Sequence, residues 1–170
     1  MALSPVRSIG IHGSVDAFEP ETLRDELSDL DVPIEVLPEG ETIPEECDAV
    51  VTLHDSPEFA DADLSWIHLI SAGVDHFPIQ KYAANGTAVT NSSGVHAECM
   101  AENAMGLMIT HAHRLDRFLA AQRDAQWRRD LAWREKFTLH GRTLCVIGLG
   151  PIGRKVAEYG DALGMAVRGV

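Results

Sequence analysis

The sequence has few cysteines, and it contains no long apolar run. Its three cysteines are far apart and odd in number, at Cys47, Cys99 and Cys145. Such a pattern fits neither a metal site nor a disulfide framework, and it favours a reducing cytoplasm. No apolar run reaches the ~18 residues of a membrane-spanning helix, so we expect none. The first ten residues also lack the apolar stretch of a signal peptide.

The spacings that mark several common catalytic and metal sites are also missing. His111 and His113 lie two apart in a predicted helix, so their side chains cannot share one face and chelate a metal. The other histidines show no metal-binding spacing, and we expect no metal site. No G-x-S-x-G turn is present, which argues against an α/β-hydrolase. Cys99 lies near a helix start and is interpreted as a packed small residue rather than a reactive thiol.

Basic residues are scarce, and lysine is especially rare. Asp and Glu number 26 against 14 Lys and Arg, of which three are lysine, and the net charge is −12. A surface this acidic repels nucleic acid and anionic membranes, so we expect neither as a partner. The composition favours adaptation to a salty cytoplasm, because the screening length falls to about 3 Å at 1 M salt. An ordinary acidic enzyme is the alternative.

Short apolar stretches alternate with helical patterns in the first half of the chain. A strand is predicted at each of five places, residues 6–12, 33–37, 47–53, 66–70 and 87–90, and those at 6–12 and 47–53 are interpreted as buried. Helices are predicted over residues 20–30, from a spacing of leucines, and over 78–84. This alternation predicts an α/β fold with a parallel sheet that is covered on both faces. We assign residues 1–96 to this first domain.

The pattern changes after residue 96. Residues 97–121 contain no proline and one glycine, Gly106, and they carry an apolar stripe. They predict one long helix. A buried strand over 142–148, a helix over 151–163 and the start of another strand at 165–170 follow. Residues 97–170 are therefore predicted to hold a linking helix and the first β-α-β unit of a second domain.

The stretch CVIGLGPIGR contains the pattern G-x-G-x-x-G at Gly148, Gly150 and Gly153. It follows an apolar strand and opens a helix, as a dinucleotide-binding turn requires. Gly148 permits the tight turn, Gly150 lets the backbone approach a pyrophosphate, and Gly153 allows close packing of helix on strand. Pro151 suits the first helical turn, and the helix N-terminus through Ile152 attracts phosphates. A glycine-rich turn without a ligand is the alternative.

A dinucleotide-binding domain needs an acidic residue about 20 residues after the turn, at the end of its second strand. The sequence reaches Val170 inside that predicted strand. Two strands and one helix cannot cover both faces of a sheet. We therefore expect this sequence to be the N-terminal part of a longer polypeptide, with the start of a Rossmann domain.

Three motifs occur together in the order and spacing of one known family. They are LISAGVDH at residues 69–76, TNSSGV at 90–95 followed by MAE at 100–102, and the glycine turn. On these motifs the sequence resembles the D-isomer-specific 2-hydroxyacid dehydrogenases. The resemblance implies a flavodoxin-like substrate domain followed by a Rossmann domain, with a long helix linking the two.

The resemblance also implies roles for individual residues. The backbone N–H groups of Ala72, Gly73 and Val74 would hold the carboxylate of the substrate, where a plain β-turn is the alternative. Met100 falls at a position near the nicotinamide that is usually small or β-branched in the family. We expect Asn91 to bond to the backbone of its own loop.

The activity that the resemblance implies is the interconversion of a 2-oxoacid and a D-2-hydroxyacid, with NAD or NADP as the cofactor. The arginine, glutamate and histidine that carry the family's chemistry would lie beyond residue 170, so these 170 residues are predicted to be inactive. A cytoplasmic homodimer is expected. An NAD(H)-sensing, corepressor-like binding protein and a formate or phosphite dehydrogenase are the alternatives.

Overall fold

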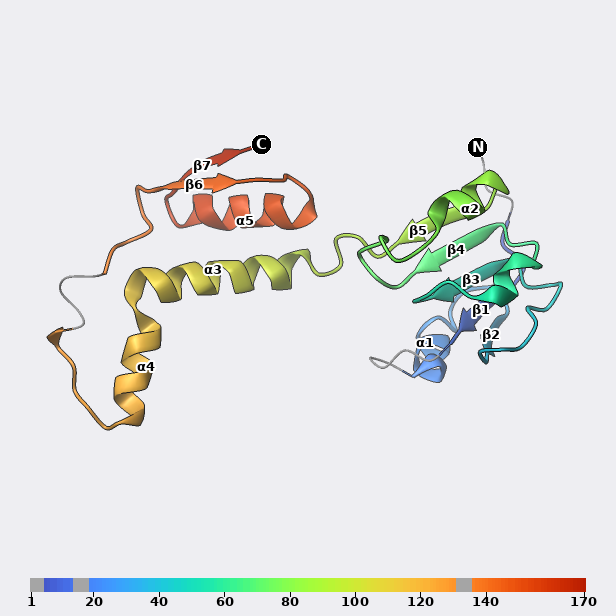
Figure 1. Cartoon of the computed structure of the whole chain (residues 1–170), viewed down its shortest axis with the longest axis horizontal. Coiled ribbons are helices and arrows are strands. Elements are labelled where there is room, and N and C mark those ends of the chain that lie inside the picture. Colours follow the sequence, from blue (N-terminus) through green and yellow to red (C-terminus); the bar gives the residue numbers. More distant parts are fainter. Residues whose placement is uncertain (1–4, 14–18, 131–135) are drawn as a thin grey trace. The chain divides into compact units, whose positions relative to one another are not determined.

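The computed structural model describes residues 5–13, 19–130 and 136–170. The chain divides into two compact units, residues 1–93 and residues 94–170 (Figure 1). Each unit contains its own parallel sheet. The mixed α/β architecture that was predicted from the alternating pattern is confirmed.

The first unit contains a five-stranded sheet in the order β2-β1-β3-β4-β5, with every neighbouring pair parallel (Figure 1). This is the strand order of flavodoxin-like folds, and it confirms the predicted class. Each strand is four residues long: β1 (Ile9–His12), β2 (Ile34–Leu37), β3 (Ala49–Thr52), β4 (Trp66–Leu69) and β5 (Ala88–Asn91).

Both faces of this sheet bury apolar side chains, because successive residues of a strand point to opposite faces. On β3, Val50 belongs to a large cluster with Phe59 and Tyr82. Those two residues come from the short 3-10 helix η1 (Pro57–Ala60) and from α2 (Ile79–Ala84). The flanking Ala49 and Val51 belong to a second cluster, against which Leu23 packs. Leu23 lies in helix α1 (Pro20–Glu26).

A buried carboxylate ties the amino ends of the central strands together. The Oδ1 atom of Asp48 accepts hydrogen bonds from the amides of Arg7 (2.9 Å) and Ser8 (3.3 Å), and its Oδ2 atom pairs with the Arg7 guanidinium at 3.2 Å. Burial alone would raise the pKa of Asp48, but the hydrogen bonds from Arg7 and Ser8 lower it. The carbonyl of Asp48 also accepts hydrogen bonds from Ser65 and Trp66, so one residue joins β1, β3 and β4.

The second unit contains a two-stranded parallel sheet and three helices among its described residues. Helix α3 packs against helix α5. The ammonium of Lys155 on α5 lies 3.6 Å from the carboxylate of Glu98 on α3 and 2.9 Å from that of Glu158. The elements are α3 (Ala97–His113), α4 (Leu115–Arg123), β6 (Thr143–Val146), α5 (Pro151–Ala162) and β7 (Ala166–Gly169).

The prediction of one continuous helix over residues 97–121 is wrong. Arg114 adopts the left-handed conformation (φ 55°, ψ 38°) and separates α3 from α4. The carbonyl of Ala112, near the end of α3, accepts a hydrogen bond from the amide of Phe137 at 3.0 Å. A left-handed conformation is uncommon for a residue other than glycine. The sequence has neither glycine nor proline at this point, so it gave no local signal of the break.

No helix within the described residues is both long and apolar enough to cross a membrane.

Candidate substrate and dinucleotide sites

The loops that follow β3, β4 and β5 leave the same edge of the first sheet. The parallel register pairs Thr52 with Leu69 and Leu69 with Asn91, which are the last residues of these three strands. Ligands of open parallel sheets bind at the carboxyl ends of the strands. The predicted carboxylate loop, residues 71–75, directly follows β4 and therefore lies at this edge.

Two carbonyl groups of the carboxylate loop accept hydrogen bonds from side chains, whereas three of its amides have no acceptor among the described residues. The hydroxyl of Ser71 donates to the Gly73 carbonyl at 2.7 Å, and the side-chain amide of Asn91 donates to the Ala72 carbonyl at 2.7 Å. The amides of Ala72, Gly73 and Val74 donate to no acceptor within the part of the chain that the structure describes. Ala72 and Gly73 are exposed. Three successive free N–H groups at an open position suit a carboxylate.

The prediction that Asn91 bonds within its own loop is wrong. Its partner is Ala72, which lies 19 residues earlier in the chain and in the loop of the neighbouring strand. Because β4 and β5 are parallel neighbours, their carboxyl ends meet, and an amide at the end of one strand can reach the loop of the other.

Two histidines lie next to the carboxylate loop. The Nε2 atom of His76 is 2.9 Å from the carbonyl oxygen of Leu53, so Nε2 carries the proton that this bond requires. The rings of His76 and His54 meet edge to face, with 5.7 Å between their centroids. This contact joins the loop after β3 to the loop after β4.

Asp55 is engaged in interactions with neighbouring side chains. The hydroxyl of Tyr82 donates to one of its carboxylate oxygens, and Lys81 lies 3.6 Å from the other. Burial and the nearby Asp55 carboxylate raise the pKa of Tyr82 well above its usual range. Asp55 therefore braces α2 against the loop after β3.

The glycine turn of the second unit has the geometry that its pattern predicts. Gly148 has a φ of +93°, a conformation that side chains rarely adopt, and its amide donates to the Val170 carbonyl at 2.8 Å. A Cβ on Gly153 would lie 1.9 Å from the Gly148 carbonyl oxygen, so no side chain fits there. A Cβ on Gly150 would meet no atom within 4 Å, which leaves the backbone open to a ligand.

The first turn of α5 provides the hydrogen-bond donors of this site. Gly150 precedes the helix, and the amide of Arg154 donates to its carbonyl at 3.0 Å. The amides before Arg154 have no acceptor in the helix, so those of Ile152 and Gly153 remain for a ligand. Pro151 has no N–H and contributes its fixed φ rather than a donor. These features fit the pyrophosphate of a dinucleotide.

Arg154 was not predicted as part of this site. Its Nε atom donates to the carbonyl of Leu149 at 2.8 Å, which holds the guanidinium on the glycine turn. A cation at this position adds to the attraction of the helix N-terminus for anions. A basic residue directly after G-x-G-x-x-G was the available signal.

Met100, the other residue predicted for the dinucleotide site, lies in the first turn of α3 and is 46% exposed.

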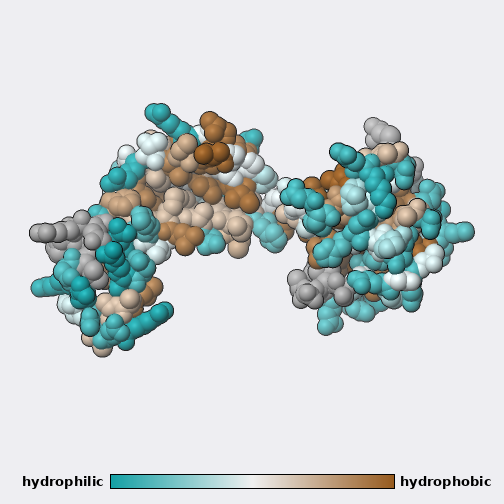
Figure 2. All heavy atoms as spheres, in the orientation of Figure 1, coloured by the Kyte–Doolittle hydropathy of each residue, from teal (hydrophilic) through white to brown (hydrophobic). Residues whose placement is uncertain are grey.

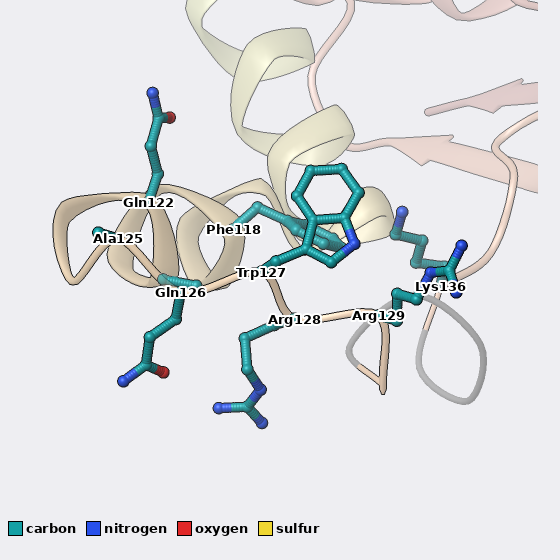
Figure 3. Close-up of a pocket in the computed structure, with 9 residues that line it drawn as sticks. Phe118, Gln122, Ala125, Gln126, Trp127, Arg128, Arg129 and Lys136 are labelled. Atoms are coloured by element: carbon teal, nitrogen blue, oxygen red, sulfur yellow. The ribbon is translucent and has the colours of Figure 1, made fainter.

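A hollow of about 600 Å³ lies at the end of α4 and belongs to neither predicted site (Figure 3). Its lining is aromatic and cationic. The ammonium of Lys136 lies 4.4 Å from the centroid of the Phe118 ring, and the Trp127 side chain is 89% exposed. Arg128 forms two hydrogen bonds with Asp130, at 2.8 and 2.6 Å.

No group of three or more potential metal ligands is found among residues 5–13, 19–130 and 136–170.

Comparison with known proteins gives the same assignment as the motifs. Residues 105–170 match the family described as D-isomer specific 2-hydroxyacid dehydrogenase, NAD binding domain. The chain belongs to the D-isomer-specific 2-hydroxyacid dehydrogenase family. A glyoxylate reductase of Pyrococcus horikoshii is 30% identical over 175 residues, which cover 95% of this chain and 50% of that protein. A hydroxypyruvate reductase of Thermotoga maritima is 35% identical over 109 residues, which cover 64% of this chain and 35% of that protein.

The fold is similar to that of a D-lactate dehydrogenase from Aquifex aeolicus, solved with NAD and lactic acid. The TM-score is 0.69 at 25% identity, and the match covers 94% of this chain and 50% of the other. This member of the 2-hydroxyacid dehydrogenase family thus spans about half the length of these two relatives, from Pyrococcus and Aquifex.

Proposed function

We infer that these residues form the substrate-carboxylate site and the start of the coenzyme site of an NAD(P)-dependent D-2-hydroxyacid dehydrogenase. The observation that carries this proposal is the loop at Ala72, Gly73 and Val74, whose amides are free while side chains hold two of its carbonyls. Membership of the family supports the same activity. The domain assignment, residues 1–96 and 97–170, remains part of the proposal.

The proposed reaction moves a hydride between the coenzyme and C2 of the substrate, and a proton between a general acid and the oxygen on C2. The nicotinamide, when bound, supplies or accepts the hydride. The chain's own residues bind and orient. The amides at 72–74 fix the substrate carboxylate. The pyrophosphate would be held by the turn of Gly148, Gly150, Pro151, Ile152 and Gly153. Met100 would lie near the nicotinamide, as the resemblance implies.

The residues that carry the family's chemistry are an arginine, a glutamate and a histidine. The resemblance puts none of them within these 170 residues. We therefore propose that this chain binds ligands but gives no turnover. The whole enzyme is proposed to be a cytoplasmic homodimer from a salt-adapted organism. The net charge of −12 supports adaptation to salt. Exposed apolar side chains on α3, among them Leu107 at 65%, support a dimer.

The test is an NMR titration of the ¹⁵N-labelled chain with oxamate, a non-reacting analogue of a 2-oxoacid. We expect the amide signals of residues 72–74 to shift. Gly73→Pro removes one donor and should weaken binding. Gly73→Ala is the matched control, because its Cβ would meet no atom within 4 Å and its amide remains. If oxamate leaves these amides unchanged, the carboxylate site is not at this loop.

A second titration, with NADH and NADPH, tests the coenzyme site. We expect the amides of Ile152 and Gly153 to shift with at least one of them, since both lie at the helix N-terminus that faces the open side of Gly150. Reduction of 2-oxoacids by this chain should stay at background. Turnover clearly above background would show that catalytic residues lie within the 170.

A further inference from the structure

The carboxylate loop is held by a side chain from another strand. The Asn91 side chain at the end of β5 donates to the Ala72 carbonyl at 2.7 Å, across the edge of the sheet. A peptide carbonyl and the following amide belong to one planar group and point in opposite directions. Fixing the Ala72 carbonyl therefore fixes the direction of the Gly73 amide, which is the middle donor of the proposed carboxylate site.

The end of β5 that carries Asn91 is itself fixed by backbone contacts. The amide of Ser92 donates to the carbonyls of Leu69 (3.1 Å) and Ser71 (3.2 Å). Leu69 is the last residue of β4, and Ser71 is the first residue of the carboxylate loop. The backbone next to Asn91 is therefore bonded to Ser71 of the carboxylate loop, and the Asn91 side chain is bonded to Ala72 of the same loop.

Four side chains extend this attachment along the outer strand. The Trp66 indole donates to the Thr90 hydroxyl at 2.8 Å. The two ring nitrogens of His68 lie 2.9 Å from the Thr90 hydroxyl and 3.2 Å from the Ser92 hydroxyl. The Ser92 hydroxyl donates to the Leu69 carbonyl at 3.3 Å.

The donor and the acceptor of each hydrogen bond in this row of side chains can be assigned, starting from Ser92. The Ser92 hydroxyl uses its one proton on Leu69, so it accepts from His68, and Nε2 of His68 carries the proton. Burial lowers the pKa of His68, which favours the neutral ring with one proton. Nδ1 then accepts from the Thr90 hydroxyl. Every donor in the row has one acceptor, and the row runs in one direction from Trp66 to the Leu69 carbonyl.

We propose that Asn91 is a positioning residue of the carboxylate site, and that the row Trp66–Thr90–His68–Ser92 holds it in place. Asn91 acts on the substrate through the Ala72 carbonyl and the Gly73 amide, and it does not touch the substrate. The proposal rests on the proposed function, because it assumes that the amides of residues 72–74 bind a carboxylate.

The experiment compares oxamate binding by the wild-type chain with binding by Asn91→Ala and Asn91→Asp. Loss of one hydrogen bond predicts that Asn91→Ala weakens binding about three- to tenfold. Asn91→Asp should weaken it further, because a carboxylate repels the Ala72 carbonyl and the incoming anion. Asn85→Ala is the matched control, since Asn85 is an exposed residue at the end of α2 in the same unit. It should bind oxamate as the wild type does.

A second measurement needs no ligand. The ¹³C signal of the Ala72 carbonyl and the ¹⁵N signal of the Gly73 amide should change in Asn91→Ala and remain unchanged in Asn85→Ala. Amide signals of the buried strands report whether each variant is folded. A variant that only loosens the fold would move those signals as well.

The outcomes separate the two proposals. If Asn91→Ala binds oxamate as tightly as the wild type, with an unchanged Ala72 carbonyl signal, the positioning role is overturned. If oxamate shifts nothing at residues 72–74 in the wild type, while the Ala72 signal still responds to Asn91→Ala, the contact is real but the proposed function fails. Weaker binding together with a changed Ala72 signal supports both.

Discussion

Residues 1–93 and residues 94–170 differ in where their apolar side chains lie. Of the buried apolar residues among those described, 14 belong to the first unit and six to the second. Of the large apolar residues that are exposed, one, Leu30, belongs to the first unit and 11 belong to the second. In Figure 2 hydrophobic residues are visible on the surface of the unit that contains α3, α5, β6 and β7.

The two units also differ in charge. Residues 1–93 carry 18 Asp and Glu against three Lys and Arg, whereas residues 94–170 carry eight against 11. The whole excess of negative charge therefore belongs to the first unit. The proposed adaptation to salt therefore concerns the surface of the first unit. The net charge of the whole chain does not show this difference between the units.

Apolar clusters and closely packed glycines both contribute to the packing of the chain. The first unit is stabilised by apolar clusters on both faces of its sheet. Close approaches at glycines occur in both units, because a Cβ on Gly10 of β1 would lie 2.2 Å from a methyl carbon of Leu37. A Cβ on Gly153 would lie 1.9 Å from Gly148, and one on Gly160 would lie 2.4 Å from a methyl carbon of Leu144.

A pair of alanine substitutions should give the largest contrast. Ile67 on β4 is 0% exposed and belongs to the large cluster, and Leu107 on α3 is 65% exposed. We expect Ile67→Ala to lower the free energy of unfolding of the first unit by about 2–5 kcal/mol, because it leaves a cavity. Leu107→Ala should change stability by less than about 0.5 kcal/mol. Urea unfolding monitored by NMR follows each unit, and equal losses would remove the contrast.

A glycine pair tests the second unit by itself. Gly153→Ala puts a methyl group against the Gly148 carbonyl and should destabilise the unit by about 1–3 kcal/mol and weaken NADH binding. Gly106→Ala, on α3, meets no atom within 4 Å and should stabilise the helix by up to about 1 kcal/mol. Thermal unfolding and calorimetric titration with NADH measure both effects. A Gly153→Ala variant that is as stable as the wild type would show that the turn can relax.

The central strands could be predicted from the sequence because they are short apolar runs, as in residues 49–52. The break at Arg114 could not be predicted from nearby residues. The carbonyl of Ala112 accepts a hydrogen bond from the amide of Phe137, which lies 25 residues later in the chain. The loop at residues 72–74 was found through its motif. The partner of Asn91 was missed, because it depends on the register between β4 and β5 and not on nearby sequence.

Salt should affect the two units differently. At 0.1 M salt the screening length is about 10 Å, against about 3 Å at 1 M. We expect the first unit to lose roughly 1 kcal/mol or more when the salt falls from 1 M to 0.1 M, because two like charges ~4 Å apart in water repel by about 1 kcal/mol. Protection in the second unit should change little. Hydrogen exchange followed by mass spectrometry reports both units in one sample, and equal changes would contradict the assignment of salt adaptation to the first unit.

The smallest effect should come from a buried histidine at the end of β1. His12 is 5% exposed and meets the ring of Phe59 edge to face, with 4.8 Å between centroids. Burial lowers the pKa of His12, although Glu58 and Glu39 oppose the shift. The unfolded chain therefore takes up the proton first as the pH falls below about 6.5. The first unit should have its full stability above about pH 6.5 and should lose stability as the pH falls below that value.

His12→Leu tests this dependence without removing the buried volume. It should flatten the loss of stability between about pH 6.5 and the lower pKa of the folded state, measured by hydrogen exchange in β1 and β3. Some slope should remain, because burial also lowers the pKa of His68. Exchange in β6 and β7 is the internal control, and the substitution should not alter its pH dependence. If the variant and the wild type lose protection in β1 in parallel as the pH falls, His12 is not the group that makes the first unit sensitive to acid.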